Sequence, residues 1–298
     1  MTTNISKRLT VFTPTYNRAY ILPQLYESLC TQDCKDFYWL IIDDGSTDDT
    51  PSLVASWMEE GQLDIIYQKQ ANGGKMREHN RAVACCQTEL FVCVDSDDML
   101  ASPTVIRDTL NYWDEHNDLS SQPEVCGLIS YRKSENGVGF FPEATMLCTL
   151  GELYEKGYVG DTTLIYKTAF IRQHPFPEIE GEKFITEAVV YDRIDLHNKY
   201  LLHPYYSQIC KYLNDGYTQN GWTHLLRNPK GYRMYYNQLV EIGKGHKRYN
   251  MKMYIACSLL AADGQTFAQC SSKPLLLAMF PLGYWQYLKL RKQLRERR

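Results

Sequence analysis

Several patterns that would assign a protein to a class at once are missing from this sequence. No stretch of eighteen consecutive apolar residues occurs, so we expect no transmembrane helix. The N-terminal MTTNISKRLTVFTPTYN lacks the apolar run that a signal peptide needs. The formal net charge is -3, whereas a general nucleic-acid-binding domain would be clearly basic. These absences predict a cytoplasmic protein that does not bind nucleic acid.

Cysteine is present ten times, but the spacing excludes the usual cysteine-based sites. No C-x-x-C pair occurs, so the sequence offers no zinc site of that kind. Cys85 and Cys86 are adjacent and the other cysteines are scattered. Without a secretory context, we expect reduced, mostly buried thiols rather than disulfides.

The first hundred residues alternate between short apolar runs and segments of helical periodicity, which predict buried strands and helices. The predicted strands are residues 9–13, 38–42, 63–68 and 90–94, and the predicted helices are residues 21–30, 50–60 and 75–86. Such an alternation predicts an α/β fold with a doubly wound, mostly parallel sheet and right-handed crossovers. Ligands bind beyond the carboxyl ends of the strands in such sheets.

After about residue 120 the pattern is less regular. The predicted elements there are strands at 125–131 and 162–166, a hairpin beginning at 137–141, and helices from Thr168 and over 187–200, 232–242 and 251–262. We expect residues 1–220 to form the catalytic domain, divided into residues 1–110 and residues 111–220. Residues 221–298 are predicted to be a helical extension.

The C-terminal segment has a character of its own. Residues 275–288 read LLLAMFPLGYWQYL, with Pro281 and Gly283 expected to interrupt the helix, and KLRKQLRERR follows. An apolar, aromatic stretch beside a basic block suits the surface of an anionic membrane. The alternative is a helix packed on the domain with a solvated basic tail. The protein is thus expected in the cytoplasm, with peripheral attachment to the membrane as a hypothesis.

Polar clusters follow each of the four predicted parallel strands. They are Thr13 to Asn17, Asp43-Asp44, Asn72 to Lys75 and Asp95 to Asp98. Because the carboxyl ends of parallel strands share one edge of a sheet, a single site is expected to collect these clusters.

The chemistry of three clusters can be read from their residue types. In Asp95-Ser96-Asp97-Asp98, neighbouring carboxylates repel without a cation, and hard oxygen ligands suit Mg²⁺ or Mn²⁺. Asp43-Asp44-Gly45-Ser46 offers carboxylates for a base or ribose, or simply closes a strand-to-helix turn. Asn72-Gly73-Gly74-Lys75 allows close backbone approach and places a lysine for a phosphate or base edge. Neither a P-loop nor a G-x-G-x-x-G fingerprint is present.

Taken in order, these stretches resemble the family-2 glycosyltransferases, which have the GT-A fold. The matching stretches are TPTYNR at residues 13–18, DDGSTD at 43–48, NGGK at 72–75 with HNRA at 79–82, and VDSDD at 94–98. The match is clearest over residues 8–110. It continues more weakly through EGEKF at 180–184, Glu187 and YLNDGYT at 212–218.

The resemblance implies a nucleotide-sugar donor site and a metal site that uses Mn²⁺ or Mg²⁺. The donor-binding residues implied are Thr13, Pro14, Tyr16, Asn17, Arg18, Asp43, Asp44, Asn72, Gly73, Gly74, Lys75, Asn80, Asp95 and Ser96. Asp97 would bind the metal directly, and Asp95 would contact ribose and metal-bound water. A UDP-sugar is the expected donor, with dTDP and GDP sugars as alternatives.

An inverting transfer also needs a general base for the acceptor hydroxyl. Family members carry an acidic residue for this at a helix start, often in a Glu-Asp pair, and this sequence has Glu187-Ala188 instead. The resemblance therefore implies Glu187 as the base, with Asp192 as the second candidate. Thr186 is placed to cap that helix, and a helix N-terminus favours an ionised carboxylate.

The expected function is transfer of a sugar, with inversion, to a hydroxyl of a glycan or lipid-linked oligosaccharide in bacterial surface-polysaccharide assembly such as capsule, lipopolysaccharide or cell wall. One alternative is a nucleotidyltransferase that makes the nucleotide sugar, but that class carries a glycine-rich basic loop where this chain has TPTYNR. Another alternative is a scaffold that binds nucleotide sugars without catalysis. The oligomeric state is not indicated by the sequence.

Overall fold

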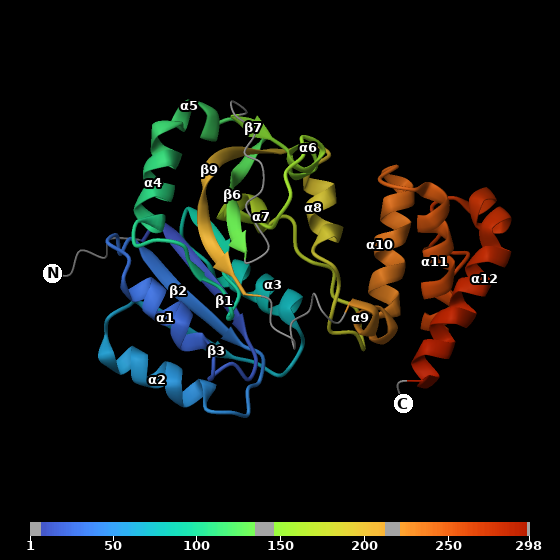
Figure 1. Cartoon of the computed structure of the whole chain (residues 1–298), viewed down its shortest axis with the longest axis horizontal. Coiled ribbons are helices and arrows are strands. Elements are labelled where there is room, and N and C mark those ends of the chain that lie inside the picture. The colour runs from blue at the N-terminus through green and yellow to red at the C-terminus, as the bar shows by residue number, and fades with distance from the viewer. Residues whose placement is uncertain (1–6, 135–145, 212–220, 297–298) are drawn as a thin grey trace. The chain divides into compact units, whose positions relative to one another are not determined.

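The computed structural model describes residues 7–134, 146–211 and 221–296 (Figure 1). The chain packs into two compact units. The first comprises Met1–Pro175 with Val190–Tyr212, and the second comprises Phe176–Val189 with Leu213–Arg298. The predicted hairpin at 137–141 and the segment 212–218 lie outside the described residues. The expected functional boundary at residue 220 stays a prediction.

The first unit is built on a mixed sheet, nine-stranded in the described residues, in the order β3-β2-β1-β4-β8-β6-β9-β5, with β7 paired to β9. The strands are β1 (Leu9–Thr15), β2 (Phe37–Asp43), β3 (Ile65–Lys69), β4 (Leu90–Cys93), β5 (Met99–Leu100), β6 (Val125–Ser134), β7 (Leu147–Cys148), β8 (Thr162–Lys167) and β9 (Lys199–Cys210). The first four strands are mutually parallel, as predicted. Beyond them, β8 runs antiparallel to both β4 and β6, and β6 and β9 are parallel.

Eight helices precede β9 in the described part of the chain. They are α1 (Leu22–Cys30), α2 (Thr50–Glu60), α3 (Lys75–Cys85), α4 (Val105–Glu115), α5 (Asn117–Ser120), α6 (Leu150–Glu155), α7 (Thr168–Ile171) and α8 (Ala188–Ile194). The predicted helices at 21–30, 50–60 and 75–86 are therefore confirmed to within one residue at each end. The mixed α/β sheet with C-terminal helices confirms the predicted GT-A fold class.

The two faces of the sheet bury different layers because side chains alternate along a strand. On one face, the odd-numbered Val11 and Ile41 belong to a core with Leu25 of α1 and Val54 of α2. On the other face, Phe12 contacts α3, so the crossover helices cover both sides as a doubly wound sheet requires. The carboxyl ends of the parallel strands remain as the edge at which the motif residues emerge.

The helix predicted over residues 187–200 is wrong at its C-terminal end. Helix α8 ends at Ile194, and β9 begins at Lys199 and continues to Cys210. Apolar residues at 200–202 could belong to a helix or to a buried strand, and periodicity cannot separate the two over so short a run. Pairing with β6 decides it, because Leu201 and Leu202 lie opposite Leu128 and Ile129.

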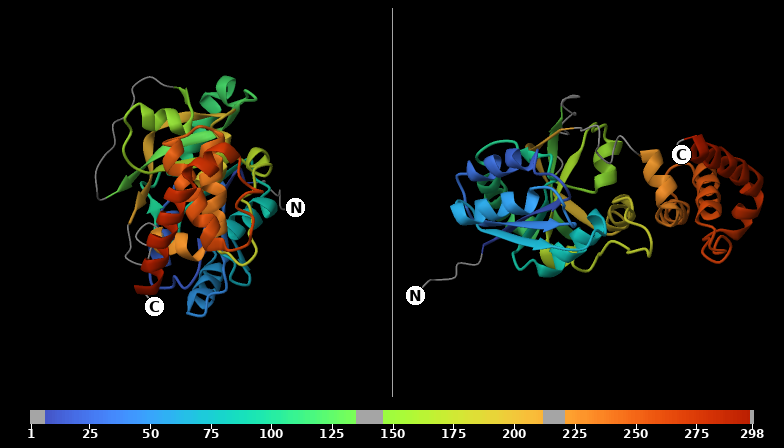
Figure 2. Two further views of the ribbon diagram at one scale, coloured as in Figure 1. Left: turned by 90° about the vertical axis from the view of Figure 1, so that its right-hand side faces the viewer. Right: turned by 90° about the horizontal axis from the view of Figure 1, so that it is seen from below.

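The second unit is helical. Its helices beyond residue 220 are α9 (Gly221–Arg227), α10 (Pro229–Glu241), α11 (Lys247–Ala261) and α12 (Lys273–Glu296). Figure 2 shows α12 running beside α11. No helix in the described residues is both long and apolar enough to cross a membrane.

The predicted interruption at Pro281 and Gly283 is wrong, because α12 is one continuous helix with Pro281 inside it. A proline within a helix costs roughly 3 kcal/mol, so packing must offset that cost. Leu276 and Met279 are buried with α11 residues in one apolar cluster. A Cβ atom at Gly283 would lie 2.5 Å from Ile255, so glycine allows the two helices to approach closely here.

All ten cysteines lie in the described residues and are free thiols. Six of them are buried, including Cys86, Cys126 and Cys257. Burial raises the pKa of the Cys126 thiol to about 12, which keeps it protonated and unreactive at neutral pH. The expectation of mostly buried thiols is therefore confirmed, and their reduced state stays a prediction.

Candidate functional site

The first candidate loop leaves the end of β1. Thr13 is fully buried, and its hydroxyl accepts a hydrogen bond from the Trp39 indole at 2.9 Å. Pro14 lies within the strand, opposite Ile42. Tyr16 then emerges with 47% of its surface exposed. Thr13 and Pro14 thus shape the strand end, whereas the exposed tyrosine ring is available to a ligand.

Asn17 joins this loop to the turn after β2. Its backbone is left-handed, with φ of 54°, a conformation that asparagine tolerates better than most residues. Its side-chain oxygen accepts the N–H of Thr47 at 2.8 Å, and its own N–H donates to Ser46 Oγ at 2.8 Å. The next residue, Arg18, donates its N–H to Thr50 Oγ1 at 3.1 Å. The TPTYNR and DDGSTD motifs are therefore held together by direct hydrogen bonds.

The two aspartates that follow β2 have different partners. Asp43 is fully buried and accepts hydrogen bonds from the N–H of Ser46 and the hydroxyl of Tyr67, so it closes the turn. Asp44 is 2% exposed, and its carboxylate accepts the N–H groups of Gly73 and Gly74, each at 2.7 Å. The structure thus gives both carboxylates a supporting role, and the contact of Asp44 with a base or ribose stays a prediction.

The glycine turn leads directly into α3. Gly74 has φ of 94°, a region that side chains avoid, and it stands immediately before the helix. Lys75, the first helical residue, reaches Asp95 beyond β4, with 2.7 Å from Nζ to Oδ1 and 3.0 Å to Oδ2. Asn80 lies five residues further along the helix and is half-buried. The third and fourth motifs are thus joined by an ion pair.

The acidic cluster after β4 is partly buried, which sets its electrostatics. Burial disfavours the charged form of Asp95, but Lys75 and Arg132 hold its pKa below the usual value. Burial and the nearby negative charge of Asp95 raise the pKa of Asp97. Asp98 is 5% exposed and lies 3.4 Å from Arg132, and burial raises its pKa to about 7 despite that cation. Ser96 between them is buried.

Asp95 and Asp97 fit a divalent cation that brings further ligands with it. Within the described ranges, no group of three or more His, Cys, Asp or Glu side chains could hold a metal alone. Asp97 forms no ion pair with a described residue, and a cation beside it would offset the repulsion from Asp95 that raises its pKa. Mg²⁺ is commonly bound by one or two carboxylates together with substrate phosphates and water.

The two candidates for the general base stand at opposite ends of one short segment. Glu187 belongs to the second unit, immediately before α8, and is half-buried. The Val189 N–H donates to the backbone carbonyl of Thr186 at 3.1 Å, which forms the first turn of the helix. Asp192 lies inside α8, in the first unit, and is 6% exposed. Exposure favours Glu187 as the residue that an acceptor can reach.

Two residues near the motifs were not found by sequence reasoning. Glu78 on α3 is 3% exposed and accepts the N–H of Thr15 at 3.1 Å. Arg132 on β6 pairs with Asp98, from which it is separated by 34 residues. Neither residue belongs to a motif, so only the fold could reveal them. His79 on the same helix as Glu78 packs against Phe12 and Phe91, and burial lowers its pKa to about 3.

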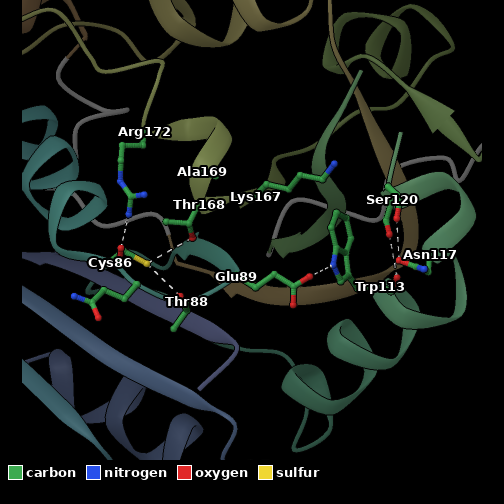
Figure 3. A pocket seen from close by; sticks show the side chains of 12 residues that line it. Cys86, Thr88, Glu89, Trp113, Asn117, Ser120, Lys167, Thr168, Ala169 and Arg172 are labelled. Atoms are coloured by element: carbon green, nitrogen blue, oxygen red, sulfur yellow. Dashed lines mark hydrogen bonds between the residues drawn. The ribbon is translucent and has the colours of Figure 1, made fainter. Parts of the chain in front are cut away.

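A hollow lies at the opposite edge of the sheet, where β4 begins and β8 ends (Figure 3). Its polar groups are engaged with the protein itself. Trp113 donates to Glu89 at 2.6 Å, Lys167 donates to the carbonyl of Gln122 at 3.3 Å, and Arg172 donates to the carbonyl of Cys86. None of the motif residues lines this hollow, so the candidate site stays at the carboxyl edge.

Comparison with known proteins agrees with the motifs. Residues 10–153 match the model of the family described as Glycosyl transferase family 2. Poly(ribitol-phosphate) beta-N-acetylglucosaminyltransferase TarS of Staphylococcus aureus is 29% identical over 179 residues, covering 57% of this chain and 30% of TarS. The chain thus matches about 30% of the full length of that relative.

Solved structures show the same fold over nearly the whole chain. The structure of S. aureus TarS 1–349 in complex with UDP-GlcNAc has a TM-score of 0.61 at 17% identity, covering 97% of this chain and 92% of that one. Mannosyltransferase PcManGT from Pyrobaculum calidifontis, in complex with GDP-Man and Mn²⁺, has a TM-score of 0.56 at 17% identity and covers 94% and 87%. Residues 10–153, which hold the four motifs joined at one sheet edge, therefore form a glycosyl transferase family 2 domain.

Proposed function

We propose that this chain is an inverting glycosyltransferase that moves a sugar from a UDP-sugar to a hydroxyl group of a surface glycan or lipid-linked acceptor. The observation that carries the proposal is the linkage of all four motifs at the carboxyl edge of the parallel strands. Asn17 joins the first to the second, Asp44 the second to the third, and Lys75 the third to the fourth. A nucleotide bound at this edge would contact all of them.

Each residue has a part in the proposed transfer. Tyr16 and the Gly73-Gly74 turn would hold the nucleoside, and Asp97 with Asp95 would hold Mn²⁺ or Mg²⁺. The bound cation would neutralise charge on the departing diphosphate. We assign the general base to Glu187, whose carboxylate takes the proton of the acceptor hydroxyl. The acceptor oxygen then bonds to the anomeric carbon as the carbon–oxygen bond to the diphosphate breaks, which inverts that carbon.

Relatives guide the choice of donor and acceptor. TarS is named as an N-acetylglucosaminyltransferase that acts on poly(ribitol-phosphate), and it has been solved with UDP-GlcNAc. We therefore propose a UDP-linked hexosamine or hexose as donor, and a cell-wall or capsular polymer, or its lipid-linked precursor, as acceptor. A nucleotidyltransferase would need a basic glycine-rich loop after β1, where this chain has an exposed tyrosine.

The donor class is tested by melting the protein with UDP, GDP or dTDP, each with and without Mn²⁺. We expect UDP with Mn²⁺ to give the largest rise in melting temperature, because a ligand at a hundred times its Kd stabilises by about 2.7 kcal/mol. Release of UDP from UDP-sugars, with an acceptor present, would then show catalysis. A protein that binds UDP but never releases it from any UDP-sugar would be a scaffold.

We also propose that the cytoplasmic surface of an anionic membrane is a partner of α12. The solvent face of this helix carries large apolar side chains at helical spacing, with exposures of 65% for Leu277, 40% for Phe280, 48% for Tyr284, 53% for Trp285 and 43% for Leu288. Residues 273–295 include five lysines and arginines, one at the start of the helix and four near its end, and no acidic residue. Lys289 lies 3.5 Å from the ring centre of Trp285, an aromatic–cation pair that suits a lipid headgroup region.

Substituting Leu277, Trp285 and Leu288 together with serine is expected to reduce binding to vesicles containing phosphatidylglycerol by tenfold or more. The wild type should bind neutral phosphatidylcholine vesicles weakly, because both apolar insertion and charge attraction contribute. Co-sedimentation measures binding of each protein to both kinds of vesicle. Val159→Ser, which removes an apolar side chain that is 75% exposed in the first unit, serves as the control. Unchanged vesicle binding, or a triple variant that differs only in oligomeric state, would contradict the membrane proposal.

A further inference from the structure

A closed circuit of hydrogen bonds joins the loops that carry three donor motifs. The carbonyl of Thr15, at the end of β1, accepts the N–H of Asp44 at 2.8 Å. The Asp44 carboxylate in turn accepts the N–H groups of Gly73 and Gly74, which lead into α3. One turn into that helix, Glu78 accepts the N–H of Thr15 at 3.1 Å and completes the circuit.

Glu78 is an unexpected residue at its position. It is 3% exposed on a face of α3 that otherwise buries apolar or aromatic side chains such as Met76 and Val83. Thr15, the last residue of β1, is paired with Asp43 of β2, whereas the pairing of β1 with β4 ends at Phe12. An apolar side chain in place of Glu78 would remove the one side-chain bond that ties α3 to the backbone of Thr15 among the described residues.

The charges around Glu78 determine its protonation. Burial and the negative charge of Asp44 raise its pKa to about 9, with Asp43 adding to the rise. The Thr15 N–H and the cation of Lys75 act in the opposite direction and do not cancel it. At neutral pH the side chain is therefore an uncharged carboxylic acid, whose carbonyl oxygen accepts the hydrogen bond without a second buried anion beside Asp44.

We propose that Glu78 is a positioning residue for the donor nucleotide. By fixing Thr15, it holds the Tyr16–Arg18 loop in register with the Asp44 turn and the Gly73-Gly74 turn, so that the three loops present one preformed surface. The residue does not contact the donor itself. This inference rests on the proposed donor site at this edge, and preformed loops lower the entropy lost when a ligand binds.

The test compares three variants by isothermal titration of UDP with Mn²⁺. Glu78→Ala is expected to raise the Kd for UDP about tenfold, which corresponds to about 1.4 kcal/mol. Glu78→Gln keeps an uncharged side chain with the accepting oxygen, so its Kd should stay within about twofold of wild type. Val83→Ala removes buried volume from the same helix away from the circuit, and its Kd should be unchanged. Turnover at saturating donor should fall less than KM rises for the alanine variant.

A second readout depends on the proton that Glu78 carries. The folded-state pKa lies above the unfolded value, so the folded protein holds more protons between about pH 4.5 and 9, and stability from this group declines as pH rises through that window. Glu78→Gln has no such proton to lose. Its melting temperature relative to that of wild type should therefore rise as the pH increases from 5 to 9. A merely structural packing role would give a difference that does not change with pH.

The outcomes separate this inference from the proposed function. Wild-type protein that binds no nucleotide overturns the donor site, and this inference with it. If wild-type protein binds UDP, two results would overturn the positioning role alone. One is a folded Glu78→Ala variant that binds UDP as tightly as wild type. The other is a Val83→Ala variant that loses as much affinity for UDP as Glu78→Ala. Should Glu78→Ala fail to fold, Glu78→Leu restores packing without an acceptor, and normal UDP affinity in that variant contradicts the role of Glu78.

Discussion

Asp97→Asn is expected to reduce turnover roughly a thousandfold or more while the protein stays folded. In the proposed reaction, Asp97 holds the cation that offsets charge on the departing diphosphate, an effect worth several kcal/mol, and each 1.36 kcal/mol is a factor of ten in rate. Asparagine keeps the shape of the side chain but loses the charge. Because burial and Asp95 raise the pKa of Asp97, removing this carboxylate without a metal should not destabilise the fold. Initial rates of UDP release, measured across a Mn²⁺ titration, give the comparison.

A matched substitution separates the metal role from a general loss of negative charge. Asp49 is exposed before α2, and its side chain caps no helix N–H, so Asp49→Asn should leave turnover and its Mn²⁺ dependence unchanged. The UDP-induced rise in melting temperature should depend on Mn²⁺ in wild type and in this control, but not in Asp97→Asn. An Asp97→Asn enzyme with normal rate and normal Mn²⁺ dependence would remove Asp97 from the metal site.

The parallel half of the fold is readable from sequence because each of its elements carries a separate signal. Runs such as residues 38–42 are buried on both faces and therefore almost wholly apolar, which only a central parallel strand requires. The antiparallel half lacks this signal. Strand β9 is assembled by pairing with β6, which lies more than sixty residues away, and α12 passes through Pro281 because packing on α11 stabilises it. Local patterns do not report contacts of that kind.

For the candidate site, the sequence identifies which residues lie together at the carboxyl edge of the sheet. It does not identify their hydrogen-bond and ion-pair partners. The motifs place Asp44 and Lys75 at the expected edge, yet their nearest partners are other motif residues rather than open space. Asp44 is engaged by two glycine N–H groups, and Lys75 by Asp95. Glu78 and Arg132 had no sequence signal, because a buried acid and a buried cation are recognised only by what surrounds them. Supporting contacts therefore require the fold, whereas the motif residues that gather at this edge can be listed beforehand.

The assignment of the base rests on chemistry that a single substitution can isolate. Glu187 stands before α8 with a half-buried side chain, and the Glu-Asp pair that the family resemblance leads one to expect is Glu187-Ala188 here. Glu187 must then take the proton of the acceptor hydroxyl without help from a second carboxylate. General-base catalysis by a positioned side chain contributes about 10²–10⁴-fold to a rate. Binding of the nucleotide needs no proton transfer, so the two properties should separate.

Glu187→Gln is therefore expected to lower kcat by about 10²–10⁴-fold and to leave the Kd for UDP unchanged. Glutamine preserves shape and hydrogen bonding but cannot take the proton, so the loss should fall on turnover alone. Glu241→Gln, at the exposed end of α10 in the same unit, is the control and should match wild type in both measurements. If Glu187→Gln retains normal kcat whereas Asp192→Asn loses it with UDP affinity intact, the base is Asp192. In that case a carboxylate that is 6% exposed would have to receive the proton, and the acceptor hydroxyl would have to reach inside α8.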